Sequence, residues 1–357
     1  MSKGILLFTD FHAHLFMEFA KHDDNYYTDR FKIQCKVLED MLSRAAKEDL
    51  GVIFGGDLFH KRAAVDVRVF NMIYGIFAKY ASNIPYIYLL RGNHDSYDNS
   101  MGSESSLDTF TALGDNVHVV STPEAFDIDD KIEDAGVHLA FMPYGEDIKD
   151  MKDQLHSFSQ DLDPKKFNLL VAHLGIDGAK QGQSNHRLAS AFALSDMYPD
   201  KFNLVYLGHY HNRQNLADNV WYGGSTMQLS FNDEGQTKGY DIIYLDGRVE
   251  FVPVDTPKFV TLTDWNDKIA KENKGNYIRL RLPEAVAKKI PDSVSKGELS
   301  NIRVEAQVDQ TVDTRLDIDA DDTPAAVVSK FMDEYYPDTK QLALEVLQEA
   351  NNSYRNY

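Results

Sequence analysis

The sequence predicts an α/β fold in which two sheets pack face to face between helices, followed by a smaller α+β domain and a helical tail. Strand-length apolar runs alternate with amphipathic helical patterns from the N-terminus, and short strand-like runs dominate from about residue 117. Two packed sheets flanked by helices accommodate both parts. Pro253 and Pro257 then bracket a linker, beyond which a third group of strands begins.

The first part of the chain carries three strands and two helices. The strands are expected at residues 5–9, 52–54 and 86–90, and the helices at residues 30–47 and 65–80. Each strand is a short apolar run, and the apolar side chains of the second helix recur at helical spacing. This alternation of strand and helix indicates a layered core.

The second part consists mainly of strands. They are expected at residues 117–120, 137–142, 169–173, 204–207, 220–222, 242–245 and 249–252. The last two are joined by Asp246-Gly247, a dipeptide typical of a tight hairpin turn.

The C-terminal part contains an acidic stretch at residues 313–322, which we interpret as a connector. Strands before it are expected at residues 259–262, 277–282 and 302–308, with helices at 265–271 and 284–290. Two short helical patterns after it, at 325–335 and 339–350, are broken at Pro337. The predicted domains are therefore residues 1–256, residues 257–312, and a linker with a helical tail at residues 313–357.

Composition limits the classes of protein that fit. The chain has 357 residues, 43% of them hydrophobic and 26% charged, which is ordinary for a globular protein. Cys35 is the only cysteine, so no intrachain disulfide can form. The apolar run at residues 5–8 is too short for a signal peptide, and no segment approaches the roughly 20 apolar residues of a membrane span. We expect a cytoplasmic protein without membrane contact, in the host cytoplasm if the source is viral.

The net charge of −19 argues against a general affinity for nucleic acid. Residues 257–303 are an exception, because they hold ten Lys or Arg against six Asp or Glu. Such a basic segment is most often a solvated face, but it is also the part of the chain best suited to contact DNA. Its candidate DNA contacts are Lys268, Lys271, Lys274, Arg279 and Arg281.

Residues of the types that bind metals follow five of the apolar runs. Asp57 and His60 lie in the sequence Gly-Gly-Asp-Leu-Phe-His, directly after the run at residues 52–54. The same arrangement recurs after four other runs, with these residues: Asp10 and His12; Asn93, His94 and Asp95; His173; His209 and His211. Any one of the histidines alone could be a packed core residue. Metal-binding residue types at the ends of five separate strands would rarely arise by chance.

These residue types suit a pair of divalent ions. Two ions about 3.5 to 4 Å apart can hold both the attacking and the leaving oxygen of a phosphoryl displacement, and they need a bridging carboxylate. Asp57 is the natural bridge. One site would be completed by Asp10, His12 and His211, and the other by Asn93, His173 and His209. Mixed carboxylate, amide and imidazole donors suit manganese, iron or zinc better than an all-oxygen magnesium site.

Two histidines near the ligands are not needed as ligands. We expect His94 to stabilise a phosphate oxygen or protonate the leaving oxygen, and His60 to position the phosphate. Both roles favour the charged imidazole. Asp95 is expected to orient a neighbouring group without touching an ion.

The motifs resemble those of the calcineurin-like metallophosphoesterases over about residues 1–256, and more narrowly those of SbcD-type DNA repair nucleases in their compact bacteriophage form. The residues that carry the resemblance are Asp10-Phe11-His12, Gly56-Asp57 with His60, Gly92-Asn93-His94-Asp95, His173 and Gly208-His209-Tyr210-His211.

The resemblance implies a manganese-dependent nuclease that acts with an SbcC-type coiled-coil ATPase, as exonuclease on duplex ends and endonuclease on single strands. Mg²⁺, Fe²⁺ and Zn²⁺ are the alternative ions. It also implies a homodimer formed through helices at residues 65–80 and 107–113. The second domain would cap the active site and contact DNA, and the tail would bind the ATPase coiled coil. The acidic composition departs from what strong DNA binding by the isolated chain would require.

Two alternatives stay open. A phosphomonoesterase or cyclic-nucleotide phosphodiesterase would keep the chemistry and change the substrate, but would not need the additional basic domain. A noncatalytic scaffold would use the site only to hold a partner, but would have no chemical need for His94.

Overall fold

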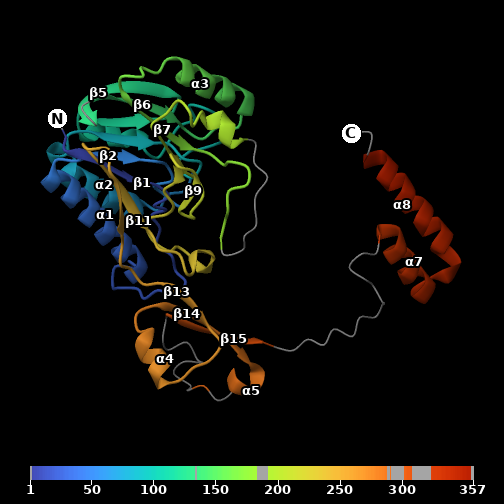
Figure 1. Cartoon of the computed structure of the whole chain (residues 1–357). Helices are drawn as coiled ribbons and strands as arrows, with labels where there is room; N and C mark the ends of the chain where they lie inside the picture. The colour runs from blue at the N-terminus through green and yellow to red at the C-terminus, as the bar shows by residue number, and fades with distance from the viewer. Residues whose placement is uncertain are drawn as a thin grey trace. The chain divides into compact units, whose positions relative to one another are not determined.

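The computed structural model describes residues 2–132, 135–182, 192–287, 290, 301–307 and 323–354. The chain forms two compact units, Met1–Ala306 and Gln307–Tyr357. The first unit holds two six-stranded sheets and a three-stranded sheet (Figure 1). The predicted α/β fold with two sheets between helices is confirmed. The predicted domain boundaries near residues 256 and 312 stay predictions.

The first sheet has the strand order β12-β11-β1-β2-β3-β4. Its four parallel strands are β1 (Gly4–Phe8), β2 (Gly51–Phe54), β3 (Ile87–Leu90) and β4 (Val117–Val120). The hairpin of β11 (Gly239–Tyr244) and β12 (Val249–Pro253) adds to β1 in antiparallel register. Every one of these strands was expected from its apolar run.

The second sheet has the order β5-β6-β7-β8-β10-β9. Its parallel strands are β6 (Ala135–Met142), β7 (Phe167–His173), β8 (Leu204–Gly208) and β10 (Val220–Tyr222). The outer strands β5 (Glu124–Ile132) and β9 (Gln214–Ala217) pair antiparallel with their neighbours and were not expected. Edge strands bury less surface than central ones, so their sequences are more polar.

Successive side chains of a strand point to opposite faces of its sheet, so each strand contributes to two layers of the core. Ile5 and Leu7 of β1 face the second sheet, where they meet residues such as Leu139 and Val171. Leu6 and Phe8 point to the opposite side and pack beneath the helices. The helices that cover this outer side are α1 (Asp29–Glu48) and α2 (Val67–Tyr80), while α3 (Ile148–Gln160), which was not expected, covers the far side of the second sheet (Figure 1).

The third sheet follows the linker and has the order β13-β14-β15. Its elements are β13 (Phe259–Leu262), α4 (Asp267–Glu272), β14 (Tyr277–Pro283), α5 (Glu284–Ala287) and β15 (Ile302–Gln307). The sheet is joined to the sandwich by Arg30 of α1, whose guanidinium carbon lies 4.4 Å from the ring centre of Phe16 and 5.1 Å from that of Phe259. The end of the predicted strand at Val308 and the predicted connector at 313–322 lie outside the described residues.

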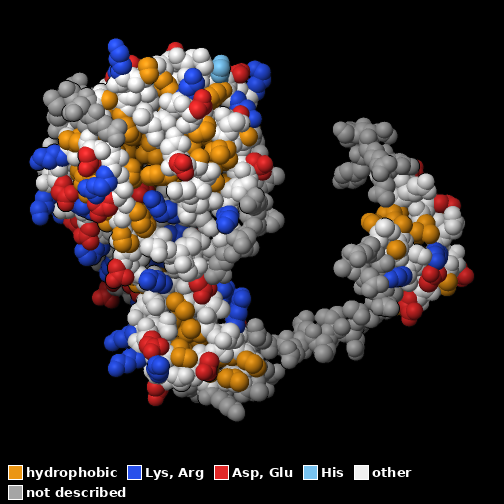
Figure 2. Space-filling model, viewed as in Figure 1, with side chains coloured by type: hydrophobic (Ala, Val, Ile, Leu, Met, Phe, Trp, Pro, Cys, Tyr) orange, Lys and Arg blue, Asp and Glu red, His pale blue; other side chains and the backbone are white. Residues whose placement is uncertain are grey.

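The second unit is a helical hairpin. Its helices α7 (Pro324–Tyr335) and α8 (Lys340–Tyr354) are separated by a short 3₁₀ turn at Pro337–Thr339, as the proline predicted. Apolar side chains of the hairpin are exposed, and Figure 2 shows them gathered on its surface. They are Phe331, Tyr335, Tyr336, Leu342 and Val346. Among the described helices, none combines the length and apolarity that a membrane crossing requires.

Candidate metal centre

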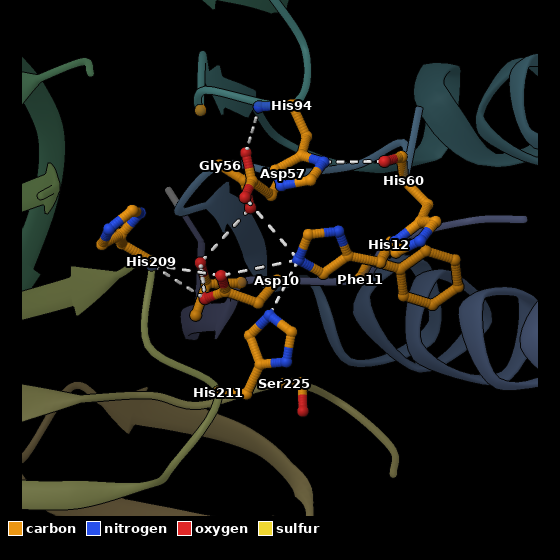
Figure 3. Close-up of polar contacts among 12 residues, drawn as sticks. Asp10, Phe11, His12, Gly56, Asp57, His60, His94, His209, His211 and Ser225 are labelled. Atoms are coloured by element: carbon orange, nitrogen blue, oxygen red, sulfur yellow. Dashed lines mark hydrogen bonds and ion pairs between the residues drawn. The ribbon is translucent and has the colours of Figure 1, made fainter. Parts of the chain in front are cut away.

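The predicted ligands meet where parallel strands end. Asp10, Asp57 and Asn93 follow β1, β2 and β3 of the first sheet, and His173 closes β7 of the second. Parallel strands place their carboxyl ends along one edge, so the ends of both sheets bring these side chains together. Figure 3 shows Asp10 and Asp57 of this cluster beside His12 and His211. His209, just after β8, completes this edge.

The backbone at these positions adopts conformations that few residues tolerate. Asp10, His12, Asp57 and His209 have φ angles of 50°, 49°, 64° and 98°. Positive φ is uncommon outside glycine and marks sites where the surrounding structure holds a strained turn. The turn at Asp10 is held by its own N–H, which donates to the carbonyl of Gly56 at 2.9 Å, so the first two motifs fix each other.

Asp57 lies at the centre of the cluster and is almost fully buried. Its Oδ2 lies 3.6 Å from His12 Nε2 and 3.3 Å from His173 Nε2, so one carboxylate oxygen faces both groups of predicted ligands. Its Oδ1 accepts the backbone N–H of His94 at 2.8 Å. This orientation is the one a bridging carboxylate needs.

The remaining ligands fall into two groups on either side of Asp57. In the first, His12 Nε2 and His211 Nε2 face each other at 3.0 Å, with Asp10 nearby. In the second, the side-chain oxygen of Asn93 lies 3.2 Å from His173 Nε2 and 3.1 Å from His209 Nδ1. These two sets are the residues predicted for the two ions, and their binding of ions stays a prediction. Asp10 also lies close to Asp57 and His173, so it borders both groups.

Backbone carbonyls fix the tautomer of two histidines. A carbonyl can only accept, so His173 Nδ1 donates to Gly55 O at 2.8 Å and its Nε2 is left to act as a ligand. In the same way His94 Nδ1 donates to His60 O at 2.7 Å, which leaves His94 Nε2 available for the substrate. These contacts suit the roles expected for the two residues.

Two glycines let the motifs approach this closely. A Cβ atom on Gly56, which has a φ of 104°, would lie 2.3 Å from His173 Nδ1. A Cβ atom on Gly92 would lie 2.1 Å from Asp57 Oδ1. Any other residue at either position would displace a predicted ligand.

Asp95 supports the backbone around the bridge. Its buried carboxylate accepts N–H groups of Asp57, Leu58, Phe59 and Gly92 at 2.8, 2.9, 3.1 and 3.1 Å. It therefore holds the turns before and after Asp57 and touches no other predicted ligand through these bonds. This is the kind of indirect role expected for it.

The charges in the cluster depend on one another. Burial opposes the charge on Asp57, but His173 and His12 outweigh it and hold the pKa of Asp57 below its ordinary value. Burial likewise opposes the charge on His173, yet Asp57 raises the pKa of this imidazole to about 9. Burial and the nearby His14 lower the pKa of His60 to about 4, so His60 is neutral at pH 7. This differs from the charged form expected for His60.

The donor set fits two divalent ions. Besides the groups around Asp57, the nitrogens of His12, His60 and His94 also lie within 4.8 Å of one another. Two imidazole nitrogens pointing at each other, with carboxylates beside them, form an arrangement that a cation stabilises. Asp10, His12, Asp57 and His211 would hold one ion, and Asp57, Asn93, His173 and His209 the other.

Metal binding is expected to stabilise the fold. Saturating Mn²⁺ should raise the melting temperature, and a chelator should lower it, because an ion at 100 times its Kd adds about 2.7 kcal/mol per site to the free energy of unfolding. An ion must displace the proton of His173, whose pKa is about 9, so the apparent affinity should rise with pH up to about 9 and then level off. Thermal melts over a pH series measure both effects. Melting temperatures unchanged by Mn²⁺, Mg²⁺, Fe²⁺ and Zn²⁺ would contradict the two-ion site.

Most of the predicted DNA contacts already have protein partners. Arg279 donates to Thr261 Oγ1 at 2.9 Å, and its guanidinium carbon lies 4.0 Å from the ring centre of Phe231. Arg281 Nε lies 3.0 Å from Glu305, and Lys268 Nζ lies 3.9 Å from Glu272. Lys271 and Lys274 form no ion pair with the residues that the structure describes. A DNA role for these five residues stays a prediction.

Three supporting residues had no sequence signal. Arg91 is fully buried and donates to Ser96 Oγ at 3.0 Å and to the carbonyl of Tyr144 at 2.7 Å, which ties the Asn93 loop to the second sheet. His14 has its ring 5.1 Å from that of His60. Lys238 donates to the carbonyl of His211. None occupies a motif position, so only the spatial neighbours reveal them.

Comparisons with known proteins identify the family of the chain. The family model for calcineurin-like phosphoesterases matches residues 4–213. A Staphylococcus epidermidis protein, named as the D component of the nuclease SbcCD, is 27% identical over 224 residues, which cover 55% of this chain and 58% of that protein. The matched region therefore spans little more than half the length of that relative.

Two solved structures match the chain at low similarity. A dimetal phosphatase from Danio rerio matches with a TM-score of 0.41 and 12% identity, over 68% of this chain and 92% of that one. A hypothetical protein from Thermus thermophilus matches with a TM-score of 0.36 and 12% identity, over 71% and 96% of the two chains. Likenesses of this degree do not bear on the substrate.

Proposed function

Because the chain belongs to the calcineurin-like phosphoesterase family, we propose that its two-ion site hydrolyses phosphodiester bonds of DNA, as an SbcD-type nuclease. The distant similarity to the nuclease component from Staphylococcus epidermidis supports this choice within the family. The proposed activities are those of an exonuclease on duplex ends and an endonuclease on single strands. Mn²⁺ is the proposed ion.

The observation that carries the proposal is a groove beside the metal centre. It has a volume of about 570 Å³, and the residues that line it include His60, His211 and, from the third sheet, Phe259. Arg30, Asn212 and Asn232 also line it. A small phosphomonoester would be held by the ions and the neighbouring histidines alone. A polymer needs contacts beyond the bond that breaks, and this groove supplies aromatic, amide and cationic groups for them.

In this hydrolysis the residues of the chain would have separate roles. When bound, a pair of divalent ions supplies charge stabilisation at the phosphate and the leaving oxygen. His94, with its Nδ1 committed to His60 O, presents Nε2 as the group that can give a proton to the leaving oxygen. Neutral His60 can donate one hydrogen bond to the phosphate. Asp95 keeps the Asp57 turn in place throughout.

The partners of the chain are part of the proposal. The exposed apolar face of the α7–α8 hairpin suits docking on a helix of an SbcC-type coiled-coil ATPase. On α2, Val67 and Met72 are 72% and 40% exposed, which suits the proposed homodimer contact. A cytoplasmic location is proposed with them.

A nuclease assay tests the proposal. End-labelled duplex and single-stranded DNA are incubated with the chain at low salt, with Mn²⁺ or Mg²⁺, beside a small chromogenic phosphomonoester. We expect Mn²⁺-dependent shortening of the duplex from its ends and internal cuts in the single strand. Asp57→Ala serves as the matched negative control. Rapid turnover of the monoester with intact DNA would instead establish the phosphomonoesterase alternative.

A further inference from the structure

A buried ion pair lies directly behind the predicted ligand His211. Lys238 and Asp233 have side chains that are each only 3% exposed, and Lys238 Nζ lies 2.9 Å from Asp233 Oδ1. The same Nζ donates to the backbone carbonyl of His211 at 2.6 Å. A buried ammonium is costly unless its hydrogen bonds are satisfied, so this geometry is strongly constrained.

The other side of the pair holds a loop. Asp233 Oδ2 accepts the N–H groups of Leu229 and Ser230 at 3.0 and 3.3 Å. Farther along the loop, Gln236 Nε2 donates to Asn212 Oδ1 at 3.0 Å, next to His211 in the chain. Residues 229–238, which we call the bridging loop, are thereby fastened to the ligand-bearing turn at two points.

The bridging loop is also fastened to the third sheet. Glu234 accepts the N–H and the hydroxyl of Thr261 at 2.5 and 2.6 Å. Phe231 packs edge-on against Phe259, with ring centres 4.9 Å apart, and lies under the guanidinium of Arg279. One short loop therefore contacts both the third sheet and the ligand-bearing turn.

We propose that Lys238 is a positioning residue for the metal centre. Through the bridging loop, the affinity for one ion of the pair then depends on the contacts that this loop makes with the third sheet. The ion affected is the one held by Asp10, His12 and His211. The other ion is held by Asn93, His173 and His209. Of these, only His209 shares the turn, and its side chain faces Asn93. Because coupling of binding free energies is reciprocal, occupancy of this one ion site would in turn favour the attached position of the sheet.

The proposal rests on the two-ion part of the proposed function and not on the substrate. Its test is therefore a calorimetric titration of the full chain with Mn²⁺, in the absence of DNA. A failed nuclease assay would leave it standing, whereas a chain that binds no Mn²⁺ would overturn both.

The first variant is Lys238→Met, which keeps the length of the side chain and removes the donor. We expect one of the two Mn²⁺ sites to weaken by about 10- to 100-fold, as for other groups that orient a metal ligand, and the second to change less than about threefold. The matched control is Lys166→Met, which makes the same exchange at another ion pair, with Asp127, just before the start of β7 and so away from the metal centre. It should lower the melting temperature without separating the two affinities.

The second variant, Glu234→Gln, leaves the buried pair intact and weakens the attachment to Thr261. We expect it to weaken the same ion by about two- to tenfold. It also keeps the test decisive if Lys238→Met does not fold. Wild-type affinity at both sites in Glu234→Gln, or an equal loss at both sites in Lys238→Met, would overturn the proposal.

Discussion

Asp57→Ala is expected to abolish DNA cleavage, with a loss of at least about 10³-fold, and to leave no site able to hold two ions. Asp57 Oδ2 is the atom that faces both His12 and His173, at 3.6 and 3.3 Å from their Nε2 atoms. Removing it also takes away the negative charge that raises the pKa of His173 to about 9. Elemental analysis and calorimetry with Mn²⁺ measure the loss of ions, and end-labelled DNA measures the loss of cleavage.

Asp57→Asn is the sharper companion to this experiment. An asparagine can still accept the N–H of His94 through its oxygen, so the local fold should survive. An amide bridges two cations poorly, because it carries no charge and offers one oxygen. We expect one ion at most to bind tightly and cleavage to fall nearly as far as in Asp57→Ala. Two tightly bound ions together with wild-type cleavage in either variant would remove Asp57 from the role of bridge.

The strand ends were predictable because two simple rules act together. Strands buried on both faces appear as continuous apolar runs, and the first polar residues after them lie at the carboxyl edge of a parallel sheet. The runs before Asp10, Asp57 and His173 follow both rules. Their spatial meeting then follows from the packing of the two sheets.

The supporting structure was not predictable by the same rules. Lys238 acts on His211 through a backbone carbonyl, a contact that leaves no trace in residue spacing. The low pKa of His60 depends on burial and on His14, neither of which is visible in the chain. The edge strand β5 (Glu124–Ile132) was missed because its sequence is largely polar. In each case the deciding factor is a tertiary neighbour and not a local pattern.

His94→Gln is expected to reduce DNA cleavage by about 10²- to 10⁴-fold while both ions remain bound. Metal binding should survive because the contact of His94 with Asp57 comes from its backbone N–H and not from its ring. The side chain of glutamine can donate a hydrogen bond but cannot deliver a proton at neutral pH. Single-turnover cleavage of DNA, with calorimetry on the same preparation, separates the two properties.

The leaving group decides what His94 does. If its Nε2 gives a proton to the departing oxygen, the defect of His94→Gln should be large for DNA, whose leaving alkoxide needs a proton, and small for bis(p-nitrophenyl) phosphate, whose phenolate does not. A defect of equal size on both substrates would show that His94 stabilises a phosphate oxygen instead. His94→Asn is the matched variant, because its amide can replace the bond from Nδ1 to His60 O and so preserve the local backbone. Wild-type DNA cleavage in both variants would remove His94 from the chemistry altogether.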